Sequence, residues 1–345
     1  MKQSMDFSRR LVRWQRAQGR HDLPWQANRD PYRVWLSEIM LQQTQVSTVI
    51  AYFDRFLARF PSVRELAAAS QDEVLGLWSG LGYYSRARNL HRCAQVVVQE
   101  HAGLFPRDPE TLQTLPGIGP STAAAIASLC FEARVAILDG NVKRVLTRFL
   151  GFADDLSVGA HERLLLAHAQ ALLPLQAADM PTYTQGIMDL GATVCTPRKP
   201  QCASCPMASM CRAKALGTPE VFPVKTRKLR RTAESLWLLL ATSPQGEVLL
   251  QQRPQQGIWA GLYCLPVFES EAALLQAVPS AERSGYLTVP AFKHVLTHKD
   301  LHLHPCHWQG VTPSARWPGQ WVSAQDWPAL GLPAPVRALL MAQTR

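Results

Sequence analysis

The pattern of apolar residues changes once along the chain, and this change limits the architecture more than any other feature. From residue 1 to about residue 216, apolar side chains recur every three or four positions between capping residues and glycines, as in amphipathic helices. Phe7, Leu11 and Trp14, for example, share one helix face. After residue 232 the apolar runs are shorter and some alternate with polar residues, which is typical of strands. The sequence therefore predicts a multidomain protein with an all-α part and a smaller α+β part.

A stretch rich in proline and basic residues, GTPEVFPVKTRKLRR, separates the two parts and shows no periodicity. We interpret it as a linker over residues 217–232, between one domain at 1–216 and a second at 233–345. In the second domain the sequence predicts a β-hairpin from 234–241 and 246–254 around the turn-like TSPQ. The other elements predicted there are a strand at 301–305 and helices at 271–278 and 334–342.

The balance of charges favours a polyanionic partner. Lys and Arg number 36 against 26 Asp and Glu, which gives a formal charge of +10, although such an excess could also serve solubility alone. The N-terminal stretch has no apolar run long enough for a signal peptide, and the longest apolar run, 236–241, is too short to span a bilayer. We therefore expect a cytoplasmic protein, nucleoid-associated if bacterial, with no membrane partner.

The segment LPGIGPSTA, residues 115–123, joins a short predicted helix at 109–115 to a longer one at 121–131. Gly117 and Gly119 allow a tight turn with positive φ, and Pro120 suits the first turn of the second helix. The loop amides and the helix N-terminus would then point outward together, which makes a site for an anion such as a nucleic-acid phosphate. A plain helix–helix turn is the alternative.

Two carboxylates have settings that suit different chemical roles. Glu38 lies in a predicted helix with apolar residues one turn away on the same face, so its pKa should be raised, as a general acid requires. Asp139 precedes a helix that begins near Asn141, whose amides, together with Lys143 and Arg144, should favour its ionised form. Such a pair matches the division of labour in glycosidic bond cleavage. The alternatives are a surface glutamate and an ordinary N-cap.

Four of the eight cysteines fall within 17 residues, with the spacing C-x6-C-x2-C-x5-C. Thiols this close indicate a shared metal centre, and both tetrahedral zinc and a [4Fe-4S] cube accept four thiolates. Zinc ribbons usually show two C-x2-C pairs, and the single pair here favours the cube. The predicted ligands are Cys195, Cys202, Cys205 and Cys211.

Several motifs together resemble a known family. LPGIGPSTA, LDGNVKRVL and the four-cysteine loop resemble the helix–hairpin–helix DNA glycosylases of the endonuclease III superfamily. LPWQANRDPYRVWLSEIMLQQTQV and GLGYYSRARNLH narrow this to adenine DNA glycosylases of the MutY type. The resemblance runs from about Arg9 to Leu340 and includes RPQQGIWAGLYCLP. It implies that a monomer removes adenine mispaired with 8-oxoguanine, and with guanine, in duplex DNA.

The resemblance also implies a fold and a cofactor. A six-helix barrel would cover about 27–136, and an iron–sulfur subdomain would combine 1–26 with 137–216. The cluster loop at 195–211 would hold a structural [4Fe-4S] cluster, and the C-terminal domain would be Nudix-like and would recognise 8-oxoguanine.

The resemblance assigns roles to residues position by position. Glu38 would protonate adenine, and Asp139 would stabilise the sugar cation. The hairpin from Gly117 to Gly119 would clamp a phosphate, optionally with a monovalent cation held by its carbonyls. The remaining DNA- or base-binding positions are Trp25, Gln26, Gln43, Thr44, Leu81, Tyr83, Ser121, Asn141, Gln185, Thr297 and His298, the last two in a loop where many relatives carry an aromatic–Ser–His triplet.

Ser121 separates two related activities. Relatives that also cut the strand carry a lysine at this position, because a Schiff base with the sugar requires an amine. A hydroxyl cannot form that imine, so we expect a monofunctional glycosylase that leaves an abasic site. The alternatives are an endonuclease III-like glycosylase/lyase, a Nudix hydrolase, whose acidic magnesium-binding box is absent after Pro266, and an iron–sulfur DNA-binding regulator without enzymatic activity.

Overall fold

The structure is a computed structural model that describes residues 2–226, 230–278, 286–314, 317 and 319–343. Its contacts divide the chain into two compact units, residues 1–67 with 92–228 and residues 68–91 with 229–345. This grouping does not follow chain order as the predicted domain boundaries do, and those boundaries stay a prediction. Residues 227–229 of the predicted linker lie outside the described residues.

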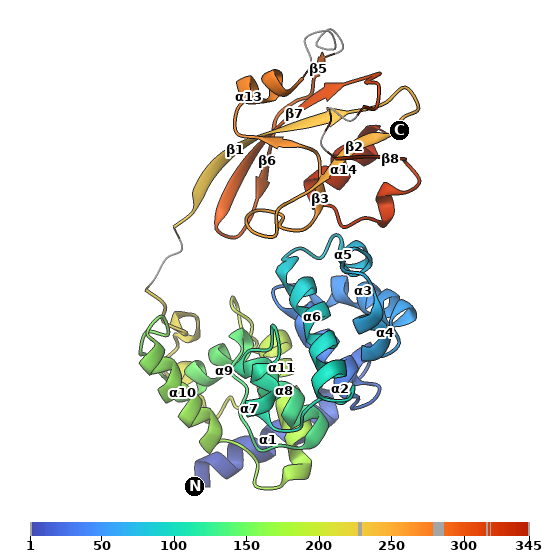
Figure 1. Cartoon of the computed structure of the whole chain (residues 1–345). Helices are drawn as coiled ribbons and strands as arrows, with labels where there is room; N and C mark the ends of the chain where they lie inside the picture. The colour runs from blue at the N-terminus through green and yellow to red at the C-terminus, as the bar shows by residue number, and fades with distance from the viewer. Residues whose placement is uncertain (1, 227–229, 279–285, 315–316, 318, 344–345) are drawn as a thin grey trace. The chain divides into compact units, whose positions relative to one another are not determined.

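The first unit is helical, as the apolar periodicity predicted (Figure 1). The long helix α8 packs against α2, α7 and α11, while α1 packs along α11. The elements of this unit are α1 (Lys2–Gln18), the 3-10 turn η1 (Pro24–Gln26), α2 (Pro31–Leu41), α3 (Val46–Arg59), α4 (Val63–Ala68), the larger part of α6 (Ser85–Glu100), α7 (Pro109–Thr114), α8 (Pro120–Phe131), α9 (Gly140–Leu150), α10 (Gly159–Ala171), the 3-10 turn η2 (Ala177–Asp179), α11 (Met180–Asp189), the π-helix η3 (Leu190–Val194), α12 (Arg212–Ala215) and the 3-10 turn η4 (Pro219–Val221).

One core cluster holds α1 against α9 and α11. Phe7, Leu11 and Trp14 are all buried, which confirms the predicted helix face. The ring of Phe7 lies 4.5 Å from that of Phe149 and 6.2 Å from that of Tyr183, measured between centroids. Apolar burial of this kind positions the N-terminal helix beside the segments that carry the site described below.

The predicted helix–hairpin–helix is present as α7, a tight turn and α8. Pro120 occupies the first turn of α8, as predicted. Gly117 has φ +78°, which a residue with a side chain rarely adopts, so the predicted positive φ is right at this position. At Gly119 the prediction is wrong, because this residue caps α8 with φ −86° and ψ 174°, an extended backbone that any residue adopts.

The second unit combines β-sheets with helices at both ends of its sequence. It holds no more than the first turns of α6 together with α5, and the rest comes from the C-terminal third of the chain. The elements are α5 (Gln71–Trp78), β1 (Thr232–Ala241), β2 (Val248–Gln252), β3 (Tyr263–Cys264), β4 (Val267–Phe268), α13 (Glu271–Ala277), β5 (Tyr286–Thr288), β6 (Phe292–Val295), β7 (Lys299–Trp308), β8 (Gln320–Val322), the 3-10 turn η6 (Trp327–Ala329) and α14 (Ala334–Gln343).

Two sheets form the β part of this unit (Figure 1). In the larger sheet the strand order is β4-β1-β7-β5, with β6 also paired to β7. The strands β1 and β7 run parallel over their full length, from the pair Thr232 and Lys299 to the pair Ala241 and Trp308. The smaller sheet has the order β3-β2-β8 and is antiparallel. The strand predicted at 301–305 lies in β7, and α13 and α14 confirm the two predicted helices.

The predicted β-hairpin is wrong, although both of its strands exist. Among the described residues a single isolated bridge, Thr242 to Val248, joins β1 to β2. Both edges of β1 are already paired, one with β4 and the other with β7. Because a strand has two hydrogen-bonding edges, β2 pairs instead with β3 and β8.

Polar contacts explain why residues 68–91 group with the C-terminal part. Tyr84 Oη donates to the main-chain oxygen of Leu332 at 2.8 Å, and Arg88 Nη1 donates to that of Ala260 at 2.7 Å. Tyr263 Oη donates to the carboxylate of Asp72 at 3.1 Å. Across the described ranges, none of the helices is both long enough and apolar enough to cross a membrane.

Candidate active site

A cavity of about 400 Å³ opens in the first unit beside η1, α2 and α11. A volume of this size is in the range of small-ligand pockets. Four residues that the sequence placed at the catalytic centre or near the base lie together in its wall: Trp25, Gln26, Glu38 and Gln185.

Glu38 projects from α2 into this cavity, and the apolar residues one turn away, Val34 and Leu41, line the same cavity. Burial, together with the smaller effect of the negative charge of Asp139, raises the pKa of Glu38 to about 7. A carboxylic acid with this pKa is substantially protonated near neutral pH. Glu38 can therefore donate a proton to a bound ligand, as predicted for a general acid.

Asp139 is the N-cap of α9, and its Oδ1 accepts a hydrogen bond from the Val142 amide at 2.7 Å. Burial raises the pKa of Asp139 above its ordinary value, while the amides of Val142 and Asn141 and the charges of Arg144 and Lys143 act in the opposite direction. The predicted partners are thus present. These amides and cations favour the ionised form, as predicted, while burial acts against them and leaves the pKa above its ordinary value.

Ser121 connects the hairpin to this carboxylate. Its Oγ accepts a hydrogen bond at 3.2 Å from the amide of Leu138, the residue before Asp139. Asn141 holds Arg144 in place, since its Oδ1 accepts from the guanidinium at 2.6 Å. The Ser121 hydroxyl therefore lies beside the backbone that leads into Asp139.

The wall near η1 contains an amide without a protein partner. Trp25 is buried and packs edge-on against Phe53, with ring centroids 5.5 Å apart. Both polar atoms of the Gln26 side chain are buried, and neither has a hydrogen-bond partner among the described residues. Since a buried unpaired amide is costly, this side chain favours a ligand that offers both a donor and an acceptor.

The other predicted DNA-binding positions lie in both units. In the first unit, Gln43 and Thr44 follow the end of α2, and Gln43 is exposed with φ +58°. In the second unit, Tyr83 is exposed with φ +49°, whereas Leu81 is buried. Since a positive φ is uncommon in residues that carry a side chain, Gln43 and Tyr83 hold unusual backbone conformations.

Within the second unit, two of the predicted DNA-binding residues, Tyr83 and Thr297, are in contact. Thr297 and His298 are exposed in the turn between β6 and β7. The hydroxyls of Tyr83 and Thr297 are hydrogen-bonded to each other, although the two residues are 214 positions apart in the chain.

The four clustered cysteines, Cys195, Cys202, Cys205 and Cys211, line one small cavity of about 30 Å³. Burial raises the pKa of Cys205 to about 11. Arg148 Nη1 donates to the sulfur of Cys195 at 3.4 Å, a contact that suits a thiolate. In the part of the chain that the structure covers, no three Cys, His, Asp or Glu side chains are grouped for a single metal ion. A shared cavity with four sulfur donors and a nearby cation fits a cluster held by four thiolates.

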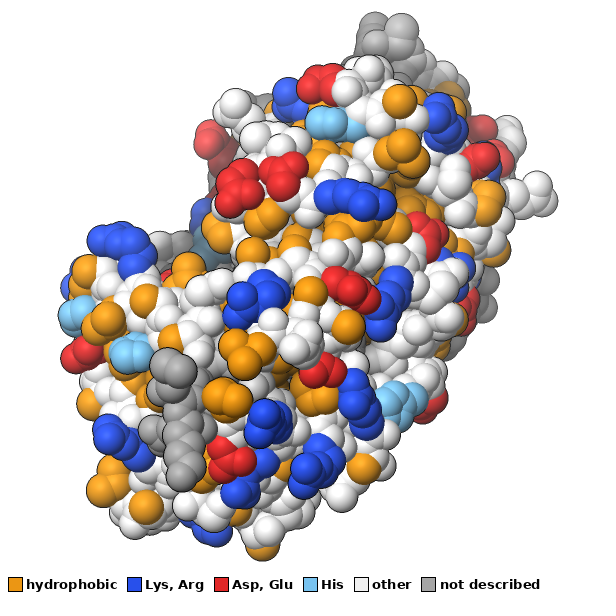
Figure 2. All heavy atoms as spheres, turned by 90° about the horizontal axis from the view of Figure 1, so that it is seen from below, with side chains coloured by type: hydrophobic (Ala, Val, Ile, Leu, Met, Phe, Trp, Pro, Cys, Tyr) orange, Lys and Arg blue, Asp and Glu red, His pale blue; other side chains and the backbone are white. Residues whose placement is uncertain are grey.

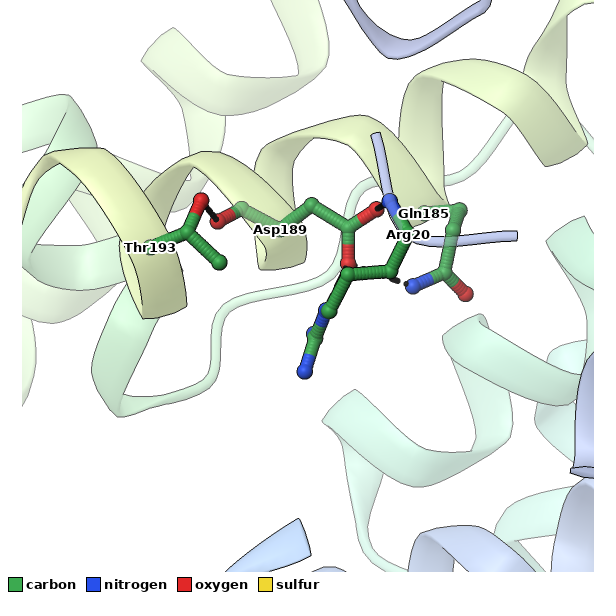
Figure 3. A network of polar contacts seen from close by, with 4 residues as sticks. All are labelled: Arg20, Gln185, Asp189 and Thr193. Carbon is green, nitrogen blue, oxygen red and sulfur yellow. Dashed lines mark hydrogen bonds and ion pairs between the residues drawn. The ribbon is translucent and has the colours of Figure 1, made fainter. Parts of the chain in front are cut away.

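Sequence reasoning missed two residues at the pocket: Arg20, which lines it, and Asp189, which lies behind its wall. Asp189 is buried and binds both Arg20 and the pocket residue Gln185 (Figure 3). Gln185 and Asp189 are four positions apart on α11, a spacing that places them on one helix face and was readable from the sequence. The contact between Asp189 and Arg20, which lies 169 positions away in the chain, could not be read from the sequence.

Lys and Arg side chains are spread over the face shown in Figure 2, as expected for a chain with a formal charge of +10. Such a surface attracts a polyanion without reading its sequence.

Comparison with known proteins agrees with this geometry. Residues 36–248 match the family of HhH-GPD superfamily base excision DNA repair proteins, and residues 237–342 match the NUDIX domain family. The chain is 37% identical over 301 residues to an adenine DNA glycosylase of Buchnera aphidicola subsp. Acyrthosiphon pisum, which covers 87% of this chain and 85% of the relative. It is 38% identical over 314 residues to an adenine DNA glycosylase of Homo sapiens, which covers 75% of this chain and 57% of that protein.

Solved structures support the fold of the helical part. A thermostable thymine-DNA glycosylase matches with a TM-score of 0.55 and 28% identity, covering 62% of this chain and 98% of that one. An endonuclease III in a non-covalent DNA complex matches with a TM-score of 0.51 and 21% identity, covering 63% of this chain and 98% of that one. The resemblance drawn from the motifs and the predicted fold class are thereby confirmed. The chain belongs to the adenine DNA glycosylase family, within the HhH-GPD superfamily of base excision DNA repair proteins, and carries a C-terminal Nudix-like domain.

Proposed function

We propose that this protein is a monofunctional glycosylase that hydrolyses the N-glycosidic bond of adenine mispaired with 8-oxoguanine in duplex DNA. The observation that carries this proposal is the cavity of about 400 Å³ with Glu38 in its wall at a pKa of about 7. Burial gives the carboxyl the protonation state that an acid needs, at the place where a flipped base would be bound.

In the proposed reaction, Glu38 gives its proton to a ring nitrogen of adenine. The bond between the base and C1′ of the sugar then breaks, and its electron pair leaves with the now neutral base. Asp139, supported in its ionised form by Arg144 and Lys143, balances the positive charge that develops on the sugar. Water adds to C1′ and returns a proton to the carboxylate of Glu38. The product is an abasic site.

Strand cleavage is not part of this proposal, because the hydroxyl of Ser121 cannot form an imine with the sugar. Ser121 instead accepts a hydrogen bond from the Leu138 amide, which holds the backbone before Asp139. The second candidate activity, a glycosylase/lyase, would need another amine at this place.

The proposed DNA contacts come from both units. The turn from Gly117 to Gly119 would bind a phosphate through its amides, with a monovalent cation as an option at its carbonyls. A Cβ built on Gly119 meets no atom within 4 Å, so this position is open to close approach by a ligand. Gln43, Thr44, Leu81 and Tyr83 would press into the stack, while Thr297 and His298 would read the oxidised base.

The proposal includes a [4Fe-4S] cluster held by Cys195, Cys202, Cys205 and Cys211, in a protein that acts as a monomer. The cluster would fold the loop at the end of the helical part and would take no part in proton transfer. Because the substrate is duplex DNA, we also infer that the protein acts in the compartment that holds the chromosome.

The test is single-turnover release of adenine from a duplex with adenine opposite 8-oxoguanine, with strand nicking measured before and after alkali. The parent should release adenine and nick the strand only after alkali. Glu38→Gln should abolish release while binding of the duplex persists, and Glu100→Gln, at an exposed position of α6, serves as the matched control. A rate near that of the parent in Glu38→Gln would contradict the assignment.

The specificity for the lesion is tested on duplexes with adenine opposite 8-oxoguanine or guanine. A hydrogen bond to the lesion contributes about 1–3 kcal/mol of preference. Thr297→Ala combined with His298→Ala should therefore reduce the preference for the oxidised partner. An unchanged preference would show that these two residues do not read the lesion.

A further inference from the structure

Asp189 lies behind the wall of the pocket, where α11 passes into the π-helix η3. Its side chain is 0% exposed, and it does not itself line the cavity, whereas Arg20 and Gln185 do. Its Oδ1 accepts from Gln185 Nε2 at 2.9 Å and from Arg20 Nε at 2.8 Å, and its Oδ2 accepts from the Arg20 main-chain amide at 3.0 Å (Figure 3). A π-helix inside a helical segment is frequently found at a functional site.

These contacts fix which way the Gln185 amide faces. An ionised carboxylate only accepts hydrogen bonds, so Gln185 must turn its NH2 group toward Asp189. Its Oε1 then points away from Asp189, as Figure 3 shows. If the Gln185 amide were inverted, its Oε1 would face Asp189 Oδ1, and neither atom could donate a hydrogen bond to the other. The carboxylate cannot rotate to relieve this, because both its oxygens are held by Arg20.

A fixed amide distinguishes purines by their substituent at position 6. Gln185 presents to the pocket the acceptor Oε1 and the one N–H that Asp189 does not use. This pair complements adenine, whose 6-amino group donates and whose N7 accepts. A 6-oxo purine carries an acceptor in place of the 6-amino group and would meet Oε1 with a second acceptor. Gln26, by contrast, has no protein partner in the described structure, so its amide is free to adapt to either base.

We propose that Asp189 is a positioning residue that locks the Gln185 amide and so sets the preference for a 6-amino over a 6-oxo purine. The proposal rests on the proposed function, and it adds a residue that does not touch the base. Arg20 contributes by holding the carboxylate of Asp189, and the distance from Arg20 Nη2 to Asp189 Oδ1 is 2.7 Å.

The experiment compares single-turnover release of adenine and of hypoxanthine, each opposite 8-oxoguanine, for the parent and Asp189→Asn. Asparagine can offer its own NH2 to Gln185 Oε1, so the amide can invert. The ratio of the two rates should fall by about tenfold or more, the size expected for one polar contact with a base. In a Gln185→Leu background, adding Asp189→Asn should change the ratio no further.

The matched control is Thr193→Val. Thr193 Oγ1 donates at 2.8 Å to the main-chain oxygen of Asp189 and does not touch its carboxylate, so the ratio should stay at the parent value. An Asp189→Asn variant that slows both bases equally would overturn the proposal and leave Asp189 a structural residue. A parent that releases no adenine would instead refute the proposed function.

A second measurement uses the unmodified protein, so that misfolding of the variant cannot hide the answer. In the side-chain amide NMR spectrum, with Gln185 assigned by its loss in Gln185→Leu, one of the two Gln185 protons should exchange slowly with water. Rapid exchange of both protons would show that the amide is not held by Asp189 and would overturn the proposal.

Discussion

Replacing Glu38 by Gln tests the burial of the acid through stability, independently of activity. A carboxyl with a raised pKa binds its proton more tightly in the folded chain than in the unfolded chain. Its favourable contribution is complete below the unfolded pKa of about 4.5 and is lost as the pH rises through the folded pKa of about 7. Glutamine is neutral throughout, so the variant escapes this loss.

The magnitude follows from the two pKa values. The pKa rises from 4.5 to about 7, and each pKa unit corresponds to about 1.4 kcal/mol, so ionised Glu38 costs the folded chain about 3 kcal/mol. About 2 kcal/mol of this falls between pH 5.5 and pH 8.5. Because a folded domain is stable by only about 5–15 kcal/mol, such a change is readily measured.

The assay is urea unfolding of the parent and Glu38→Gln at pH 5.5 and pH 8.5, followed by circular dichroism. The stability of the variant minus that of the parent should be larger at pH 8.5 by about 2 kcal/mol, since other groups titrate equally in both chains. Glu100→Gln, at an exposed position, should show no such change. An equal difference at both pH values for Glu38→Gln would refute the burial of its charge.

Three further predictions concern the reaction and the cluster. With Glu38 as the acid, the single-turnover rate of adenine release should fall about tenfold for each pH unit above about 7, and a flat profile to pH 9 would contradict this role. Ser121→Lys should let borohydride trap an enzyme–DNA adduct that the parent does not form, and efficient trapping of the parent would contradict the monofunctional reaction. Protein purified without oxygen should be brown with about four irons per chain, and Cys211→Ser should lose iron; a colourless, fully active zinc protein would exclude the cluster.

Much of the secondary structure was predictable because it follows from local rules. Asp108 caps α7 and Asp139 caps α9, each by accepting a hydrogen bond from the amide three residues on, and such caps are visible as residue types at fixed offsets. Strand partnership was not predictable in the same way. The pairing of β1 with β7 joins residues more than 60 positions apart, whereas the hairpin prediction relied on the short turn after Ala241. Long-range pairing prevailed, because it covers the whole strand.

The site shows the same division between local and distant information. The helical setting of Glu38 gave the direction of its pKa correctly, since the neighbours that matter lie one turn away. The setting of Asp139 gave its capping amides and cations but not the net direction of its pKa. The reason is that burial depends on packing against segments distant in sequence. The contact of Arg20 with Asp189, the partner of Gln185, could not be predicted for that same reason.

The backbone at Gln43 and Tyr83 supports a role for both side chains outside the protein core. Both residues adopt positive φ, which costs a residue with a side chain roughly 1–2 kcal/mol relative to the right-handed region. Gln43 stands just after the end of α2, where glycine is the usual residue. Glycine would remove the strain, and neither side chain fills the core, since both are exposed. Gln43 and Tyr83 therefore lower the stability of the folded chain relative to glycine at the same positions. We propose that contact with a bound partner, as in the proposed DNA stack, accounts for that loss.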